Sequence, residues 1–335
     1  MKFISCASYY GTGSSAITDL MSEYSTVYSF TNEEFRFLQD PDGVDDLAFH
    51  LIENHNRHNA GHALKRFKRL VDFYSGGWYG KKYEAYFNGN WKKCSYEYIN
   101  SLTDFKFNGW WFYDLYDRGM LFYFQKRVLD KLLHKTIWMG DPERTLNTMK
   151  DEITYCSAPS ESEFICKTKI YLEKLFSSVC PKDKYVMVDQ IVPPSNLWRY
   201  TRYFDDIKVV VVDRDPRDLW ILEKYYWRDG VIPYDDVNIF CKWFKYTRNH
   251  RKKELYDNKS VKLVKFEDLI YKYDEITKEL ESWIGLSSTD HINKKKFFIP
   301  EKSINNTCLW KNNRNINTEE ISIIEKDLSE YLYSY

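Results

Sequence analysis

A glycine-containing loop near the amino terminus constrains the fold of this chain more than any other segment. Residues 9–15 have the sequence Tyr-Tyr-Gly-Thr-Gly-Ser-Ser and follow a short apolar run at residues 3–6. Residues 16–21 (Ala-Ile-Thr-Asp-Leu-Met) then suit a helix. A strand, a tight loop and a helix in this order point the free N–H groups of the first helical turn at whatever the loop encloses. This glycine loop, residues 9–15, is therefore a candidate anion-binding site.

The glycine loop lacks one residue of the phosphate-binding loop of NTPases, which has the pattern G-x-x-x-x-G-K-[ST]. When Gly13 is taken as the second glycine, Ser8 replaces the first, Ser14 the lysine and Ser15 the hydroxyl residue. The missing lysine, which would neutralise the β- and γ-phosphates, argues against hydrolysis of ATP or GTP. The backbone N–H groups that bind an anion remain, although an ordinary strand-to-helix turn would have a similar sequence.

Three further apolar runs predict a parallel sheet. They occupy residues 185–189, 207–212 and 261–264, and helical patterns, among them residues 273–284, follow or precede them. Short apolar runs separated by helices are typical of strands buried on both faces. We therefore expect an α/β protein with a P-loop-like three-layer fold, a central parallel sheet and a large, mainly helical insertion. A single domain would cover 1–335, and an aromatic-rich insertion at 31–156 would shape an acceptor site.

Two arginines follow the second of these runs. Residues 213–218 have the sequence Asp-Arg-Asp-Pro-Arg-Asp, which places Arg214 and Arg217 at the carboxyl end of a buried strand. Ligands of open α/β sheets bind at that end, and arginine is suited to bidentate contacts with phosphate. The alternative is that both arginines pair with Asp213, Asp215 and Asp218.

Three segments together resemble the sulfotransferases that use 3'-phosphoadenosine 5'-phosphosulfate (PAPS), especially bacterial members that modify carbohydrates. Residues 12–15 (Thr-Gly-Ser-Ser) resemble the family's 5'-phosphosulfate loop, and residues 214–218 resemble its 3'-phosphate strand and helix. Residues 266–269 (Phe-Glu-Asp-Leu), with a helix ending Trp-Ile-Gly-Leu at 283–286, resemble a later family segment. The segments occur in the family's order at both ends of the chain, and the resemblance skips residues 31–156.

The resemblance implies a PAPS-dependent sulfotransferase that acts on a hydroxyl of a carbohydrate or surface glycan and needs no metal. Arg214 would bind the 3'-phosphate that distinguishes this donor from ATP. Asp189, which ends the strand between the two cofactor segments, is the candidate general base. A structural acid that caps the following turn is the alternative for Asp189. The predicted cofactor-binding residues are Gly11, Thr12, Gly13, Ser14, Ser15, Ala16, Arg214, Arg217, Trp310 and Lys311.

The sequence departs from the family at two positions. Gly11 stands where the family usually has a basic residue, and Leu222 where it often has a serine for the 3'-phosphate. Both contacts would have to come from elsewhere, for example from Lys311 or a basic side chain of the insertion, and otherwise the activity is altered or absent. Arg36, Arg66 and Lys65 are candidates for binding an anionic acceptor, and the default explanation for all three is a solvated helix face.

The composition narrows the classes of function. The chain has 49 basic and 49 acidic residues, and this zero net charge gives no general electrostatic case for binding nucleic acid or a membrane surface. Its 7 cysteines lack the spacing of a disulfide framework or a zinc site, and no segment approaches the roughly 20 apolar residues that span a bilayer. We expect a cytoplasmic protein with free thiols, no metal, no nucleic-acid partner and no membrane insertion. The 28 Tyr, 21 Phe and 11 Trp predict an aromatic core, although aromatic rings also stack on sugars.

Two other functions remain open. A P-loop kinase or NTPase would use Asp189 or Asp213 near magnesium, and the missing lysine argues against it. A catalytically silent protein would keep the nucleotide fold and use the aromatic insertion to hold a glycan. The absence of a basic residue at Gly11 supports that silent protein.

Overall fold

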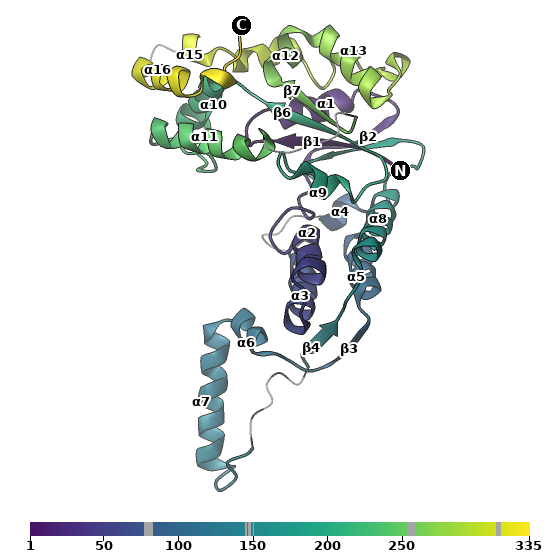
Figure 1. Ribbon diagram of the computed structural model, residues 1–335, viewed down its shortest axis with the longest axis vertical. Coiled ribbons are helices and arrows are strands. Elements are labelled where there is room, and N and C mark those ends of the chain that lie inside the picture. Colours follow the sequence, from purple (N-terminus) through teal and green to yellow (C-terminus); the bar gives the residue numbers. More distant parts are fainter. Residues whose placement is uncertain (77–82, 145, 147–148, 150, 253–258, 313–315) are drawn as a thin grey trace. The chain divides into compact units, whose positions relative to one another are not determined.

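The computed structural model describes residues 1–76, 83–144, 146, 149, 151–252, 259–312 and 316–335 (Figure 1). The chain forms two compact units. The first, here called the sheet unit, combines Met1–Asp40 with Phe176–Tyr335, and the second, the helical unit, is Pro41–Leu175. The insertion was predicted at 31–156, so the helical unit begins and ends later in the chain than that prediction.

Five parallel strands form the centre of the sheet unit. The order across the sheet is β2-β5-β1-β6-β7, and every neighbouring pair is parallel. This confirms the predicted α/β class with a central parallel sheet. The four valines at 209–212 are fully buried, as expected for a strand covered on both faces. The strands are β1 (Lys2–Ser8), β2 (Val27–Glu34), β5 (Tyr185–Asp189), β6 (Ile207–Asp213) and β7 (Val261–Lys265).

Short helices connect and cover these strands. The α-helices of the sheet unit are α1 (Ser14–Met21), α9 (Leu197–Thr201), α10 (Pro216–Leu222), α11 (Val237–Lys252), α12 (Phe266–Tyr271), α13 (Tyr273–Ile284), α14 (Pro300–Ser303), α15 (Leu309–Asn312) and α16 (Thr318–Asp327). Helix α10 continues as a π-helix, η2 (Glu223–Trp227), and three 3₁₀ turns are η3 (Ser288–Asp290), η4 (Ile304–Asn306) and η5 (Ser329–Tyr331). Gly285 ends α13 with a φ of 89°, which fits the left-handed C-cap that its position after a helical pattern predicts.

Both faces of the sheet are covered. Ile4 of β1 belongs to a buried cluster with residues of α1, α12 and α13. Phe3 points to the opposite face because side chains alternate along a strand, and its ring centre lies 5.3 Å from that of Phe176 and 4.9 Å from that of Phe204. Phe176, near the end of α8 (Glu161–Ser177), and Phe204, which follows α9, both belong to the sheet unit, so residues of this unit cover the second face of the sheet as well.

The strand order creates one crevice at the edge of the sheet. Strands β2 and β5 lie on one side of β1, whereas β6 and β7 lie on the other. The connections that follow β1 and β6 therefore leave in opposite directions, and such a switch opens a crevice at the carboxyl ends of the two strands. The glycine loop follows β1 and Arg214 follows β6, so both are positioned at this crevice.

The helical unit has an aromatic core. The Trp91 indole is fully buried and donates its Nε1–H to the backbone carbonyl of Val71 at 2.9 Å, and the ring of Tyr83 packs edge-on against it at 5.1 Å. The sequence predicted helices here but missed the antiparallel pair β3–β4. The elements are α2 (Val44–Ala48), η1 (Phe49–Glu53), α3 (Arg57–Tyr74), α4 (Tyr83–Tyr86), α5 (Trp91–Leu102), β3 (Phe105–Asn108), α6 (Phe112–Arg118), α7 (Met120–Thr136), β4 (Ile153–Cys156) and α8.

Candidate nucleotide-binding site

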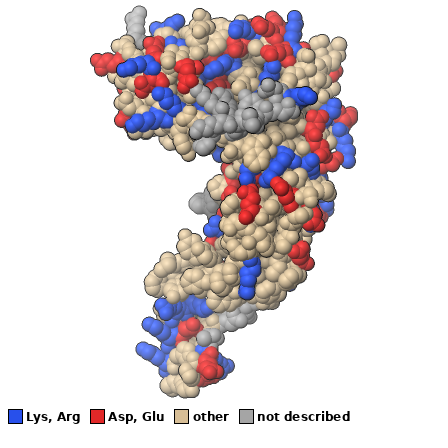
Figure 2. Space-filling view, in the orientation of Figure 1, with Lys and Arg blue, Asp and Glu red and all other residues tan. Residues whose placement is uncertain are grey.

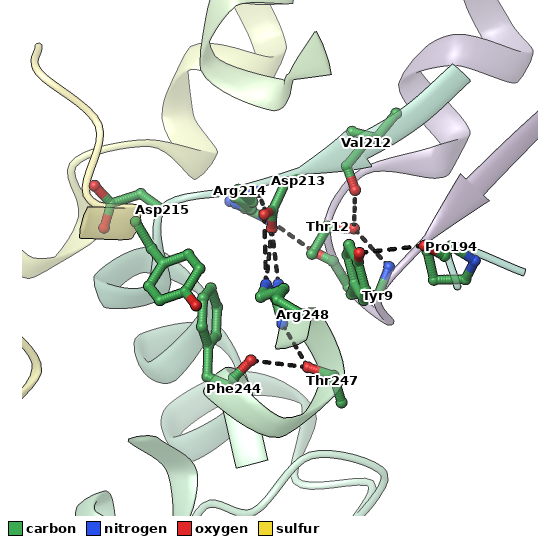
Figure 3. Close-up of polar contacts among 12 residues, drawn as sticks. Tyr9, Thr12, Pro194, Val212, Asp213, Arg214, Asp215, Phe244, Thr247 and Arg248 are labelled. Atoms are coloured by element: carbon green, nitrogen blue, oxygen red, sulfur yellow. Dashed lines mark hydrogen bonds and ion pairs between the residues drawn. The ribbon is translucent and has the colours of Figure 1, made fainter. Parts of the chain in front are cut away.

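The glycine loop turns sharply and is tied to the neighbouring strand. Tyr10, Gly11 and Gly13 have φ angles of 44°, 65° and 102°, in the left-handed region. The buried hydroxyl of Thr12 accepts a hydrogen bond from the Tyr9 N–H at 3.1 Å and donates one to the carbonyl of Val212 in β6 at 2.8 Å (Figure 3). Thr12 therefore fixes the loop to β6, and the loop leads directly into the first turn of α1.

Two glycines of the loop make close approaches that no other residue could make. A Cβ on Gly13 would lie 2.4 Å from the Phe266 ring, and a Cβ on Gly11 would lie 2.6 Å from the Trp227 ring and 2.9 Å from Leu219. The positive φ at both positions adds backbone strain to any substitution. The indole of Trp227 thus fills the space that a side chain at position 11 would need.

Arg214 lies beside the glycine loop and is buried. Its guanidinium donates to the carbonyl of Gly11 at 3.3 Å and to the carbonyl of Asn306, and lies 4.5 Å from the centre of the Phe266 ring. Its Nε has no hydrogen-bond partner among the described residues, and none of their carboxylates is within 4.0 Å of the guanidinium. Burial lowers the pKa of Arg214, and the largest opposing influence is the charge of Asp218. A buried cation bonded only to neutral carbonyls can accept an anion as a further partner.

The other arginine of the motif is neutralised within the protein. Arg217 pairs with Asp215 at 2.7 Å and with Glu325 at 2.9 Å, and it lies 4.0 Å from the centre of the Trp310 ring. The sequence left open that both arginines pair with Asp213, Asp215 and Asp218. Arg217 forms an ion pair with Asp215, whereas Arg214 forms an ion pair with none of the three. Asp213, the last residue of β6, pairs with the buried Arg248 at 2.8 Å, as Figure 3 shows.

A pocket of about 640 Å³ brings the loop and Arg214 together. Gly11, Gly13, Ser14, Ser15, Ala16 and Arg214 line it, whereas the buried Thr12 lies behind it. The pocket is of ordinary size for a small-molecule site. Leu222 and Phe266, which were compared with the family above, and Asn306, in the segment 305–311 that carries Trp310 and Lys311, also line it. Further lining residues, which the sequence did not predict, are Asp19, Trp227, Lys296, Phe297, Phe298, Ile299, Lys302 and Ser303.

Three charged side chains of this pocket were not recognised in the sequence. Lys296 and Lys302 lie on the segment between α13 and η4, where no motif marks them, and only the local abundance of lysine at 294–296 hinted at a basic site. Asp19 lies in α1; burial, and then the charge of Glu23, raises its pKa to about 6. Trp310 and Lys311 do not line the pocket: Trp310 packs with a cluster that includes residues of α10, α11 and α16, and Lys311 lies over the Trp310 ring.

Asp189 ends β5 directly beside β1. Its side chain is only 4 % exposed, and burial, followed by the charge of Glu34, raises its pKa to about 7. The neighbouring Ser14 hydroxyl lowers this pKa in turn, and the Oδ1 atom of Asp189 has no hydrogen-bond partner among the described residues. Glu34 is the register partner of Asp189 in β2, and Ser14 lines the pocket. Asp189 itself is not among the residues that line the pocket, and its raised pKa makes its carboxyl group a base of near-neutral strength next to a residue that does.

The two predicted acceptor-binding arginines fall in different units. Arg36 belongs to the sheet unit, where it donates to the Tyr10 hydroxyl and to the Asp40 carboxylate, both at 3.0 Å. Arg66 belongs to the helical unit and contacts Asp42 at 3.2 Å and Asp117 at 3.5 Å. It lines a cavity of about 410 Å³ within that unit, together with His50, Asn59, His62, Trp111 and Tyr113.

Neither a metal centre nor a membrane span is found in the described parts of the chain. No group of three or more His, Cys, Asp or Glu side chains there could hold a metal ion. No described helix combines the length and the apolar character needed to cross a bilayer.

Comparison with known proteins gives limited similarity. No protein-family model matches the sequence, and no curated protein sequence matches it. Mouse sulfotransferase SULT7A1, solved in complex with PAP, is 12 % identical over 48 % of this chain and 69 % of its own, with a TM-score of 0.32. Sulfotransferase STF1 from Mycobacterium tuberculosis H37Rv is 12 % identical over 92 % of this chain and 76 % of its own, with a TM-score of 0.34. Similarity at this level assigns no activity to the chain.

Proposed function

We propose that the protein transfers a sulfuryl group from PAPS to a hydroxyl of a carbohydrate or surface glycan. The observation that carries this proposal is Arg214, a buried arginine that faces the glycine loop without a carboxylate partner among the described residues. In this proposal the glycine loop and the start of α1 hold the 5'-phosphosulfate, and Arg214 holds the 3'-phosphate.

The chemistry of the pocket suits a donor with phosphates at both ends. Besides Arg214, Lys296 and Lys302 supply positive charge, and the rings of Trp227 and Phe297 supply flat surfaces for a base. The lysine that ATP-hydrolysing loops require is missing, since Ser14 takes its place. This combination favours an adenosine bisphosphate over ATP with magnesium.

Asp189 is the proposed general base. When bound, the donor supplies a sulfur–oxygen bond whose leaving group is 3'-phosphoadenosine 5'-phosphate (PAP). Asp189 would take the proton of the acceptor hydroxyl as that oxygen bonds to sulfur, and the electrons of the broken bond would remain on the departing phosphate. A carboxylate with a pKa of about 7 is matched to this task, whereas an ordinary aspartate is a much weaker base. The N–H groups at the start of α1 would stabilise the negative charge that develops on the phosphosulfate.

The carbohydrate acceptor is supported by the cavity of the helical unit. Sugars are bound by aromatic faces together with a few directed polar groups, and Trp111, Tyr113, Asn59 and Arg66 offer both kinds of contact there. Within the sheet unit, Arg36 is proposed separately as a contact for an anionic acceptor, because its guanidinium lies beside Tyr10 of the glycine loop.

Nucleotide binding tests the donor assignment. Isothermal titration of the full chain should give tighter binding of PAP than of ATP with magnesium. Arg214→Ala should weaken PAP binding by roughly ten- to a hundredfold, the equivalent of losing about 1.5 to 3 kcal/mol from a hydrogen bond to a charged group. Arg217→Ala is the matched comparison: it should lower the melting temperature, because Asp215 loses its partner, and leave PAP affinity nearly unchanged.

The same experiment separates the other functions. Binding of ATP with magnesium alone would favour a kinase or NTPase and refute the sulfotransferase proposal. Tight binding of PAP without transfer from radiolabelled PAPS to a panel of polysaccharides would favour a silent binding protein. An Arg214→Ala variant that binds PAP normally would show that the 3'-phosphate assignment is wrong.

A further inference from the structure

Helix α7 exposes an apolar face along its whole length. None of its residues is buried, although the helix begins with the sequence Met-Leu-Phe-Tyr-Phe. Leu121, Phe124, Val128 and Leu132 are each more than half exposed, and their spacing of three or four residues places them on one face. A soluble helix normally buries such a face against its own protein, so this face requires another partner.

Basic residues border the apolar face. At 100° per residue, Lys131 and Lys135 lie along one edge of it and Arg127 lies beyond them, whereas Lys126 lies toward the far side of the helix with Asp130, the only acid in the helix. Asp130 accepts a hydrogen bond from the Leu146 N–H at 2.8 Å. Figure 2 shows Lys and Arg side chains gathered at the lower end of the view, where α7 lies. The zero net charge of the whole chain therefore conceals a local concentration of positive charge.

Exposed aromatic side chains continue the apolar surface into the preceding segment. Trp110, Phe112 and Tyr116 are 42 %, 63 % and 69 % exposed, and α6, which carries the last two, packs against α7. Lys126 lies 4.7 Å from the centre of the Trp110 ring. Rings of this kind are favoured at the boundary between lipid headgroups and acyl chains, and lysine can bury its stem while its ammonium group stays in water.

We propose that α7, with the exposed rings around α6, docks the protein on the surface of an anionic membrane. The helix would lie in the plane of the interface, with Leu121, Phe124, Val128 and Leu132 in the acyl region and its lysines at the headgroups. Charge complementarity selects this partner. A second copy of the chain fits less well, because packing two α7 faces together would bring the lysines of both copies close to one another.

Vesicle binding by the full-length protein tests this inference independently of sulfuryl transfer. The protein should float with vesicles of equal parts phosphatidylglycerol and phosphatidylcholine, bind vesicles of phosphatidylcholine alone far more weakly, and dissociate as salt is raised. Each basic residue near an anionic surface changes the partition coefficient by roughly fivefold. The triple variant K126Q/K131Q/K135Q should therefore bind about a hundredfold more weakly.

A matched variant controls for charge. K242Q/K278Q/K326Q removes three exposed lysines from α11, α13 and α16, lowers the net charge by the same amount, and should bind the anionic vesicles as the wild type does. The apolar variant L121Q/F124Q/L132Q should lose vesicle binding while keeping its circular dichroism spectrum and melting temperature, because the three side chains are exposed.

Two results would overturn the proposal. The first is vesicle binding that depends neither on phosphatidylglycerol nor on the lysines of α7. The second is a wild-type dimer in analytical ultracentrifugation that fails to bind vesicles and becomes monomeric in L121Q/F124Q/L132Q. That result would assign the face to a second copy of the chain.

Discussion

Replacing Asp189 by asparagine should stabilise the protein at alkaline pH and strongly lower the transfer activity proposed above. Burial raises the pKa of Asp189 from the ordinary value of 3.8 to about 7. At about 1.36 kcal/mol per pKa unit, keeping this carboxylate ionised above pH 7 costs about 4 kcal/mol of folding free energy. Asparagine has nearly the same shape and carries no charge, so Asp189→Asn removes that cost.

The sign of the effect depends on pH. The unfolded chain ionises Asp189 near pH 3.8, whereas the folded protein keeps it protonated up to about pH 7. The ionisation of Asp189 therefore costs the wild type no free energy of unfolding below pH 3.8. The cost grows as the pH rises from 3.8 to about 7. The two proteins should differ little near pH 4, and Asp189→Asn should be more stable by up to about 4 kcal/mol at pH 8.

Urea denaturation at a series of pH values measures this difference. Asp183→Asn, a change of an exposed residue in the turn before β5, controls for the substitution itself and should leave stability unchanged at every pH. Transfer from PAPS should fall by about a hundredfold or more in Asp189→Asn only, since the variant has no base. A stability difference that is independent of pH, or an asparagine variant that is less stable at pH 8, would refute a raised pKa and favour a structural acid.

Three other substitutions test the packing and the charges of the sheet unit, two of them in the pocket itself. Gly11→Lys should weaken PAP binding and lower the melting temperature rather than supply the basic residue, because its Cβ would lie 2.6 Å from the Trp227 ring at a φ of 65°. Asp19→Asn should tighten PAP binding severalfold in titration calorimetry at pH 8 and have little effect at pH 5, because the pKa of Asp19 is about 6 and its charge repels the ligand only above that value. Arg248→Met should cost about 3 to 5 kcal/mol in urea denaturation by leaving Asp213 buried without its partner, and the double variant with Asp213→Asn should recover most of that loss.

Local sequence signals were sufficient to predict most of the sheet. The run at residues 185–189 became β5 with the same bounds, because apolar residues with consistent β preference are followed by a polar residue that ends the strand. β6 and β7 each extend one residue beyond their predicted ends. β2 was missed because Val27–Glu34 mixes polar and aromatic residues at the edge of the sheet. The pair β3–β4 was missed because neither strand is buried enough to need an apolar run.

The composition of the pocket could be predicted only in part. The glycine loop and Arg214 lie next to strand ends, so the sheet itself determines where they are. Lys296 and Lys302 reach the pocket because the segment after α13 returns to it, and no residue pattern specifies such a path. Trp310 and Lys311 were predicted only from the resemblance to the family, whereas in the fold Trp310 packs on Arg217. The choice between Arg214 and Arg217 likewise required the positions of Asp215 and Glu325.

The glycine at position 11 now has a physical explanation. A basic side chain there would occupy the space of the Trp227 indole, which belongs to a π-helix that continues α10 from the segment carrying Arg214. The loop and the π-helix are therefore packed against each other, and in the proposed reaction positive charge for the departing phosphate would come from other elements of the pocket. Lys296 and Lys302 line the pocket and could supply this charge. They lie on the segment that also brings the carbonyl of Asn306 to Arg214. The absence of a basic side chain at position 11 is thus compatible with a site whose positive charge lies on Lys296 and Lys302. It supports a catalytically silent binding protein less strongly than the sequence alone suggested.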